Sequence, residues 1–346
     1  MKNIQEVLKE RILILDGAMG TMIQQEKLEE DDFRGAKFKD TKILLKGNND
    51  ILNLTKEKLI YDIHTKYLMS GADIIETNTF NSTRVSQSDY DCADISYELN
   101  FHGGKIARKA VDDYLKKNPN EVKFVAGVLG PTNRTCSMSP DVNNPGFRNI
   151  TFDELLTDYE ESTEALISSG VDLIMVETVF DTLNAKAALM AIQNIQDKVK
   201  TTLPVMISAT ITDLSGRTLS GQTIEAFYNS IIHVNPLSIG LNCALGPKEL
   251  EPYVIELDRI SEKFISVHPN AGLPNAFGEY DETPESMGNF ASKWSKNGYI
   301  NIIGGCCGTT PEHINLMKKN VKNIEPRQKK IFEPKLHLSG LESFQF

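Results

Sequence analysis

The sequence predicts an α/β fold, a (β/α)8 TIM barrel followed by a C-terminal extension. Eight short apolar runs recur along the 346-residue chain, and most are nearly continuous instead of alternating with polar residues. This pattern is typical of parallel strands that are covered by helices. The segments between the runs have helical periodicity, so eight strand–helix units indicate a closed barrel. The expected strands lie within residues 12–17, 72–80, 122–130, 171–179, 204–211, 236–244, 264–271 and 299–304.

Four of the intervening segments show the helical pattern most clearly. In 55–71 the apolar residues fall on one stripe, and Gly71 follows as a C-terminal cap. The segment 153–170 repeats this pattern and ends at Gly170. Residues 182–196 are rich in Ala, Leu and Gln and favour a helix through intrinsic propensity. In 311–324 a proline occupies a plausible first helical position.

An open, doubly wound sheet is the alternative architecture. That fold usually carries a glycine-rich phosphate-binding turn after its first strand. Here the first run leads into DGAMGT, residues 16–21, which lacks the required glycine spacing, so the barrel is favoured. We expect the long charged connection 18–55 to add turns at the mouth or base of the barrel. We assign residues 1–325 to the barrel and 326–346, which contain Pro and Lys and have little periodicity, to a strap or linker stub.

Composition and charge argue against a nucleic-acid-binding, a secreted or a membrane protein. The chain has 37 basic and 47 acidic residues, a net charge of −10, and no basic stripe, which argues against nucleic acid as a partner. No segment has the features of a signal peptide or reaches membrane-spanning length, so we expect a cytoplasmic protein that binds no membrane. Five cysteines, an odd number, suggest free thiols or metal ligands in such a compartment.

The carboxyl ends of the expected strands supply the candidate site, because barrel enzymes carry their chemistry there. The polar, thiol and glycine residues at these ends are Asp16, Gly17, Glu76, Thr77, Asn78, Gly130, Thr132, Asn133, Glu177, Thr178, Ser208, Asn242, Cys243, His268, Asn270, Cys306 and Cys307.

Three of these residues form a candidate metal site. Cys306 and Cys307 are adjacent in GGCCG, and Cys243 ends a strand that lies two positions away in the barrel. Three thiolates suit zinc and leave its fourth position open, as in catalytic sites. The flanking glycines would let both neighbouring cysteines turn toward one ion. The alternative is that each of these cysteines is a small buried apolar residue. Cys92 lies in a polar stretch and Cys136 in an expected loop, and we interpret both as bystanders to the site.

A zinc site with three thiolates is suited to binding another thiol as its thiolate, because the metal lowers the pKa of the bound thiol. The natural reaction is then alkyl transfer to a thiol substrate. Asp16 and Glu177 could hold an ammonium group, or they could pair with a barrel cation or cap a helix. Backbone amides around Gly17 and Thr77 could receive a carboxylate. His268 could be a metal ligand, but three cysteines already suffice, so we expect it to support the ligands or to pack beside them. Glu76 could be structural or could line the cavity.

Four motifs carry a family resemblance: GGCCGTTPEH, LNCALGP, LDGAMGT and MVETVFDTLNAKAAL. With them the chain resembles the zinc-dependent homocysteine S-methyltransferase family over nearly its whole length. The segments GPTNRTCSMSPDVNNPGFRNITFDEL and HPNAGLPNAFGEYDETP are similar to the homocysteine-binding modules of cobalamin-dependent methionine synthases. Cys136 departs from the small residue that the resemblance leads us to expect.

The resemblance implies zinc on Cys243, Cys306 and Cys307, which would also be the catalytic residues. It implies a homocysteine site near Asp16, Gly17, Thr77 and Glu177, and we add Asn242 as a substrate-binding candidate. The methyl group would come from methylcobalamin carried by another module or by a separate cobalamin- and folate-binding subunit, and would yield methionine. We expect the chain to be a natural separate subunit and not a fragment trimmed from a longer synthase.

Three alternatives stay open at this point. The same transfer could use betaine or S-methylmethionine as the methyl donor. The chain could be a non-catalytic partner subunit that binds homocysteine and zinc, or a thiol sensor. It could also be an ordinary barrel with a structural zinc.

Overall fold

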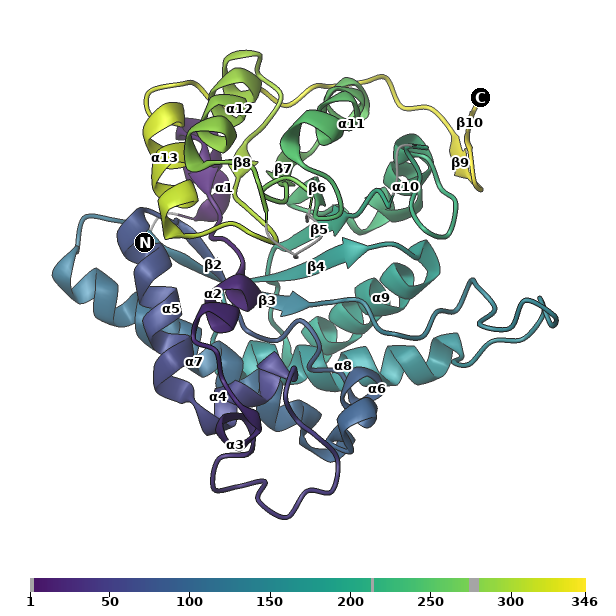
Figure 1. The fold of residues 1–346 in the computed structure, drawn as a ribbon. Helices are drawn as coiled ribbons and strands as arrows, with labels where there is room; N and C mark the ends of the chain where they lie inside the picture. The colour runs from purple at the N-terminus through teal and green to yellow at the C-terminus, as the bar shows by residue number, and fades with distance from the viewer. Residues whose placement is uncertain (1–2, 213–214, 274–279) are drawn as a thin grey trace.

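The eight apolar runs form one parallel sheet that closes into a barrel, which confirms the predicted fold class (Figure 1). The computed structural model describes residues 3–212, 215–273 and 280–346. The sheet order is β1-β8-β7-β6-β5-β4-β3-β2, and a parallel bridge between Leu15 and Ile74 joins its two ends. The strands are β1 (Leu13–Ile14), β2 (Ile74–Glu76), β3 (Phe124–Leu129), β4 (Leu173–Val179), β5 (Val205–Ala209), β6 (Ser238–Asn242), β7 (Phe264–His268) and β8 (Ile302–Ile303).

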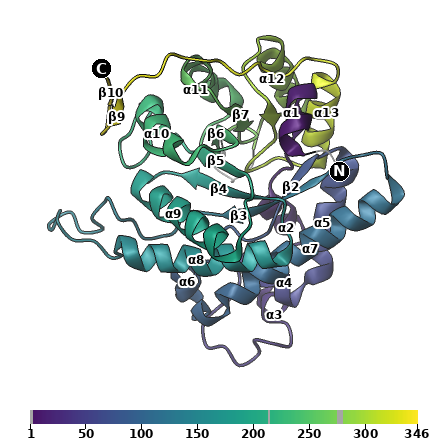
Figure 2. The same cartoon turned by 180° about the vertical axis from the view of Figure 1, so that it is seen from behind.

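Helices surround the strands in both views (Figures 1 and 2). The predicted caps are confirmed: Gly71 and Gly170 follow their helices with φ of 104° and 92°, in the left-handed region that favours glycine. A capping box at Thr151 begins α8. The helices that follow the strands are α5 (Glu57–Ser70), α7 (Ser96–Lys117), α8 (Phe152–Ser169), α9 (Thr182–Val199), α10 (Ile224–Ile231), α11 (Pro247–Ile260), α12 (Pro284–Lys296) and α13 (Pro311–Val321).

Shorter elements fill the two ends of the barrel. Helix α1 (Ile4–Glu10) packs its buried side chains into the apolar cluster formed by the barrel strands. The long connection after β1 carries the extra turns that its length predicted: α2 (Met19–Gln25), α3 (Glu30–Arg34), η1 (Asn49–Ile51) and α4 (Leu52–Thr55). After β2 come α6 (Arg84–Gln87), η2 (Ser88–Tyr90) and η3 (Ala93–Ile95), and η4 (Ile232–Val234) extends α10.

The C-terminal extension passes α12 and α11 and ends beside α10 (Figure 1). It closes with an antiparallel hairpin, β9 (His337–Ser339) and β10 (Ser343–Gln345), whose Ser339 hydroxyl donates to the carbonyl of Ala226 in α10. Periodicity in the sequence did not reveal this hairpin. The domain boundary after residue 325 stays a prediction.

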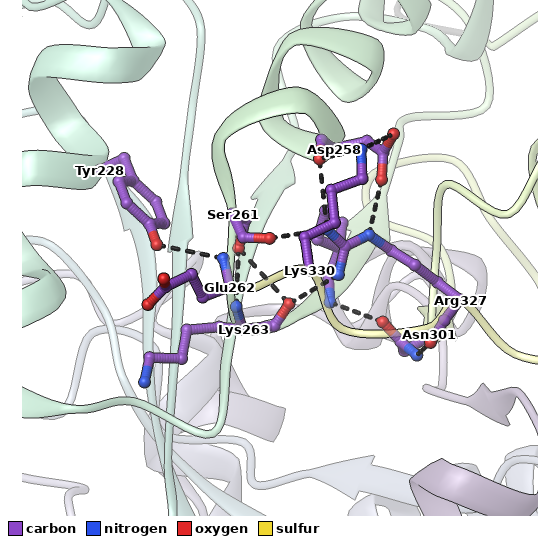
Figure 3. Close-up of polar contacts among 9 residues, drawn as sticks. Tyr228, Asp258, Ser261, Glu262, Lys263, Asn301, Arg327 and Lys330 are labelled. Carbon is purple, nitrogen blue, oxygen red and sulfur yellow. Dashed lines mark hydrogen bonds and ion pairs between the residues drawn. The ribbon is translucent and has the colours of Figure 1, made fainter. Parts of the chain in front are cut away.

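Arg327 fastens the start of this extension to the barrel (Figure 3). Its side chain is buried and donates to Asp258 Oδ1 at 2.6 Å, to the Ser261 carbonyl at 2.7 Å and to the Lys263 carbonyl at 3.0 Å. Lys330 reaches the other oxygen of Asp258 at 2.8 Å. A buried guanidinium needs this many acceptors, so Arg327 holds the segment firmly against the base of β7.

None of the helices in the described ranges combines the length and the apolar character needed to cross a bilayer.

Candidate active site

A cavity of about 430 Å³ opens at the carboxyl ends of the barrel strands; we call it the mouth cavity. It collects the ends of β1, β2, β4, β6 and β8 together with α2. A larger cavity of about 690 Å³ lies around Arg11 and Lys318, but it contains none of the predicted site residues. The mouth cavity is lined by residues 16–21, 24, 49, 50, 76–78, 80, 81, 128, 177, 178, 243, 280 and 305–307.

The three predicted metal ligands meet in this cavity. The Sγ atoms of Cys243, Cys306 and Cys307 all lie within 4.8 Å of one another, and those of Cys243 and Cys307 are 3.8 Å apart. Tetrahedral zinc with Zn–S bonds of about 2.3 Å places its sulfur ligands about 3.8 Å apart. The three sulfur atoms therefore lie close enough together to hold one zinc ion.

Local backbone geometry explains how neighbouring thiols face one point. Cys243 has a φ of 60°, in the left-handed region that non-glycine residues rarely adopt, and its amide donates to the His268 carbonyl at 3.0 Å. Gly308, with a φ of 81°, ends the turn that follows the vicinal pair. At Gly305 a side chain would collide with Thr309. Of the glycines around the pair, Gly308 therefore supplies an unusual backbone angle, and Gly305 permits a close approach.

The thiols share a negative charge before any metal arrives. Hydrogen bonds from the thiols of Cys243 and Cys306 lower the pKa of Cys307 to about 3. Contact with Cys243 and then Cys307 holds the pKa of Cys306 well above its usual range. One thiolate stabilised by two thiols is a site prepared for a soft cation.

Three carboxyl groups lie beside the thiols: Asp16, Glu76 and Glu177. Burial raises the pKa of Glu177 to about 8, with Cys307 adding to the rise. Burial and the neighbouring Glu177 hold the pKa values of Asp16 and Glu76 well above their usual ranges. Asp16 Oδ2 accepts from the Glu76 amide at 3.1 Å, but its Oδ1 has no partner among the described residues.

The surroundings of these carboxyl groups lack compensating charge. Among the described residues, the lining contains no lysine, arginine or histidine, and neither Asp16 nor Glu177 forms an ion pair. The alternative of pairing with a barrel cation, which the sequence left open, is therefore not realised in this part of the chain. The raised pKa values favour the protonated acids, and a positively charged ligand beside them would lower these pKa values and be bound by the resulting carboxylates.

The two amides that could receive a carboxylate differ. Within the described ranges, the Gly17 amide has no hydrogen-bond acceptor, and a side chain at Gly17 would approach Thr309 Oγ1 to 2.7 Å. The Thr77 amide already donates to the Ala126 carbonyl at 3.0 Å. Both residues line the cavity, but only the Gly17 amide is available.

Two further predicted positions lie beneath the cavity. Asn242 is fully buried and is not part of the lining. His268 is also buried, neither ring nitrogen has a partner among the described residues, and burial lowers its pKa to about 3. A nitrogen of this neutral ring lies within 4.8 Å of carboxylate oxygens of Glu76 and Glu177. Cys92 and Cys136 are buried outside the lining.

Sequence reasoning missed two titratable residues of the cavity lining. Asp50 follows a polar stretch within the long connection after β1, and Tyr280 lies between β7 and α12. Burial, followed by Cys307, raises the pKa of Tyr280 to about 12. No periodic signal marks either residue: Asp50 lies in the three-residue helix η1 and Tyr280 in the connection before α12, and only the fold brings both to the mouth.

Comparisons with known proteins support the family of the chain and its fold. A family model described as homocysteine S-methyltransferase matches residues 13–321. The metallated form of the homocysteine methyltransferase MmuM from Escherichia coli superimposes with a TM-score of 0.71 at 20 % identity, covering 91 % of this chain and 98 % of that one. Its oxidized form gives a TM-score of 0.69 at 20 % identity, covering 90 % and 97 %. At this identity the two structures support the fold.

Proposed function

The chain belongs to the homocysteine S-methyltransferase family, and we propose that it methylates the sulfur of homocysteine in the mouth cavity. One observation carries the proposal: three converging thiols open into a cavity that also holds four carboxyl groups, those of Asp16, Asp50, Glu76 and Glu177, and, among the described residues, no basic side chain. A thiol with an ammonium group is complementary to both halves of that arrangement.

Binding would use the carboxyl groups and the free amide. Glu177 and Asp16 would hold the ammonium group of homocysteine, and the Gly17 amide would donate to its carboxylate. Asn242 Nδ2 lies 3.3 Å from Glu177 Oε1 and 4.0 Å from Cys306 Sγ, so the carboxylate and the thiol are separated by one side-chain amide. That spacing suits an amine and a sulfur on one short chain. Direct substrate contacts by Thr77 and Asn242 stay predictions.

Cys243, Cys306 and Cys307 would hold the zinc ion. When bound, zinc would lower the pKa of the homocysteine thiol and keep it as a nucleophilic thiolate. The remaining contribution of the chain is positioning, because fixing amine and sulfur together removes the entropy of orienting the nucleophile.

We propose methylcobalamin, delivered by another module or subunit, as the methyl donor. A cavity of about 430 Å³ has room for homocysteine but not for a corrin ring as well, so such a donor would approach over the rim. The uncompensated carboxyl groups favour a second candidate, a small cationic donor such as betaine or S-methylmethionine, which could enter beside homocysteine.

Methionine formation from homocysteine by the zinc-loaded chain tests the proposal, with methylcobalamin, betaine and S-methylmethionine supplied separately. We expect turnover with methylcobalamin, and we expect Cys306→Ala to abolish it, whereas Cys136→Ala, outside the cavity, should keep it. Turnover with a cationic donor alone would replace the donor but keep the site. If homocysteine binds but no donor supports turnover, the result would favour the alternative that the chain is a non-catalytic partner subunit. Full activity and zinc content in Cys306→Ala would refute the site.

A further inference from the structure

Asn242 connects the two halves of the site from below. It is the last residue of β6 and its side chain is fully buried. Oδ1 accepts from the Thr178 amide at 3.2 Å and from the Ser208 hydroxyl at 2.6 Å. Because two donors occupy the oxygen, the orientation of the amide is determined and Nδ2 must face the other way.

The nitrogen end of the same amide reaches the functional groups. Nδ2 lies 2.8 Å from Thr178 Oγ1, 3.3 Å from Glu177 Oε1 and 4.0 Å from Cys306 Sγ. One buried side chain therefore contacts the carboxylate proposed for the ammonium group and a thiol proposed for the metal.

Glu177 and Thr178 form a bulge in β4. The register between β4 and β5 pairs Val176 with Ile207 and Val179 with Ala209, so two residues of β4 oppose Ser208 alone. Bulges re-aim side chains next to functional sites. Here the bulge places both residues in the lining of the mouth cavity.

The bulge depends on an unfavourable backbone conformation. Thr178 has a φ of 57°, and a β-branched residue in the left-handed region persists only where its surroundings impose it. Asn242 holds both ends of Thr178, its amide through Oδ1 and its hydroxyl through Nδ2. Ser208, opposite the bulge, in turn holds Asn242.

We propose that Asn242 is a positioning residue: it holds Thr178 in the left-handed conformation and thereby sets Glu177 at a defined separation from Cys306. This inference rests on the proposed function and deepens it. A defined distance between the amine-binding carboxylate and the sulfur site selects the length of the substrate, so Asn242 also contributes to discrimination between homocysteine and cysteine, which is one methylene shorter.

The test is a rescue experiment. Homocysteine and cysteine affinities are measured by calorimetry, and zinc content by mass spectrometry, for wild type, Asn242→Ala, Thr178→Gly and the double variant. We expect Asn242→Ala to weaken homocysteine binding at least tenfold, to weaken cysteine binding less, and to keep its zinc. Glycine adopts the left-handed conformation freely. In the Thr178→Gly background, the fold loss of homocysteine affinity caused by Asn242→Ala should therefore be less than a third of the fold loss that it causes in wild type.

Two further variants keep the test decisive. Lys200→Gly replaces another left-handed residue, with a φ of 57°, at the end of α9 and should give no rescue. Ser208→Ala replaces Asn242→Ala in the test if the latter does not fold. It removes one hydrogen bond to the Asn242 side chain and should weaken homocysteine binding in the same way but by a smaller factor. An equal loss in the wild-type and Thr178→Gly backgrounds, or loss of zinc together with homocysteine affinity, would overturn the inference. A wild-type chain that does not bind homocysteine would instead contradict the proposed function.

Discussion

Asp50 shows how burial sets the chemistry of a single side chain. It lines the mouth cavity, and a single oxygen, Oδ1, accepts from both the Asn81 amide at 2.8 Å and the Ser82 hydroxyl at 2.7 Å. Burial raises the pKa of this carboxyl from its ordinary value of 3.8 to about 6. Compared with the unfolded chain, the folded chain therefore binds the proton of Asp50 more tightly. Ionisation of Asp50 at neutral pH consequently lowers the free energy of unfolding.

Asp50→Asn should become more stabilising as the pH rises. The pKa in the folded state is the higher one, so the contribution of Asp50 is complete below pH 3.8 and is lost as the pH rises through 6. An asparagine oxygen can accept from the same two donors without carrying a charge. Relative to wild type, we expect the variant to gain about 1 to 2 kcal/mol in free energy of unfolding between pH 5 and pH 8.

Urea unfolding at both pH values measures this difference. Asp197→Asn, at an exposed position of α9, controls for the loss of one negative charge. A difference from wild type that stays constant between the two pH values would show that the pKa of Asp50 is not raised in the folded chain, because the carboxyl would then be ionised in both states over this range.

At the scale of elements, the C-terminal extension depends on one buried ion pair. Arg327 and Asp258 are 1 % and 13 % exposed in their side chains, and Lys330 also binds Asp258. Farther along, the extension reaches the loop before α10, where the Thr223 amide donates to the Leu341 carbonyl at 3.1 Å. The sequence of the extension has little periodicity, so tertiary contacts determine the path that the extension takes between the barrel base and this loop.

Arg327→Ala should loosen the extension and destabilise the chain. Removal of one partner of a buried pair leaves Asp258 poorly compensated, with a cost of about 3 kcal/mol. We expect trypsin to cleave after Lys330 or Lys335 in the folded variant much faster than in wild type. Arg259→Ala, a surface arginine 3.8 Å from Glu225, is the matched control and should change stability by less than about 0.5 kcal/mol. Equal cleavage of both variants would contradict the anchoring role.

At the scale of the whole molecule, closure of the barrel creates the site. Cys243 and Cys307 are 64 residues apart along the chain, and β7 lies between their strands in the sheet. Their sulfur atoms meet because both strands end at the same rim and the backbone turns inward there. The metal would therefore link two separate strand–helix units.

Zinc should raise the thermal stability of the intact chain. A ligand that binds only the folded state contributes about 3 to 4 kcal/mol when its free concentration is 100 to 1,000 times its Kd. We expect one equivalent of zinc to raise the Tm by several degrees and a chelator to reverse the rise. Differential scanning fluorimetry measures the Tm. Cys306→Ser should show no such rise, and a rise in that variant equal to that of wild type would mean that the zinc binds elsewhere.

The sequence by itself determined the architecture and most of the chemical groups. Continuous apolar runs and glycine caps such as Gly71 and Gly170 are local signals, and they predicted the strands and helix ends. Cys243, Cys306, Cys307, Asp16 and Glu177 could be proposed because strand ends of a barrel share one rim. The structure brings these five side chains to one cavity, while their roles remain proposals.

Only the tertiary structure decided how the groups are combined. It showed that the Thr77 amide already donates to a backbone carbonyl, and that Asp50 and Tyr280 enter the cavity from the short helix η1 and from the connection before α12. It also showed that Asn242 connects Glu177 to Cys306 through a bulge. These features depend on register, on barrel closure and on backbone angles at Thr178 and Cys243. Periodicity reports which face of an element is buried, but it contains no information about which side chains of distant strands meet.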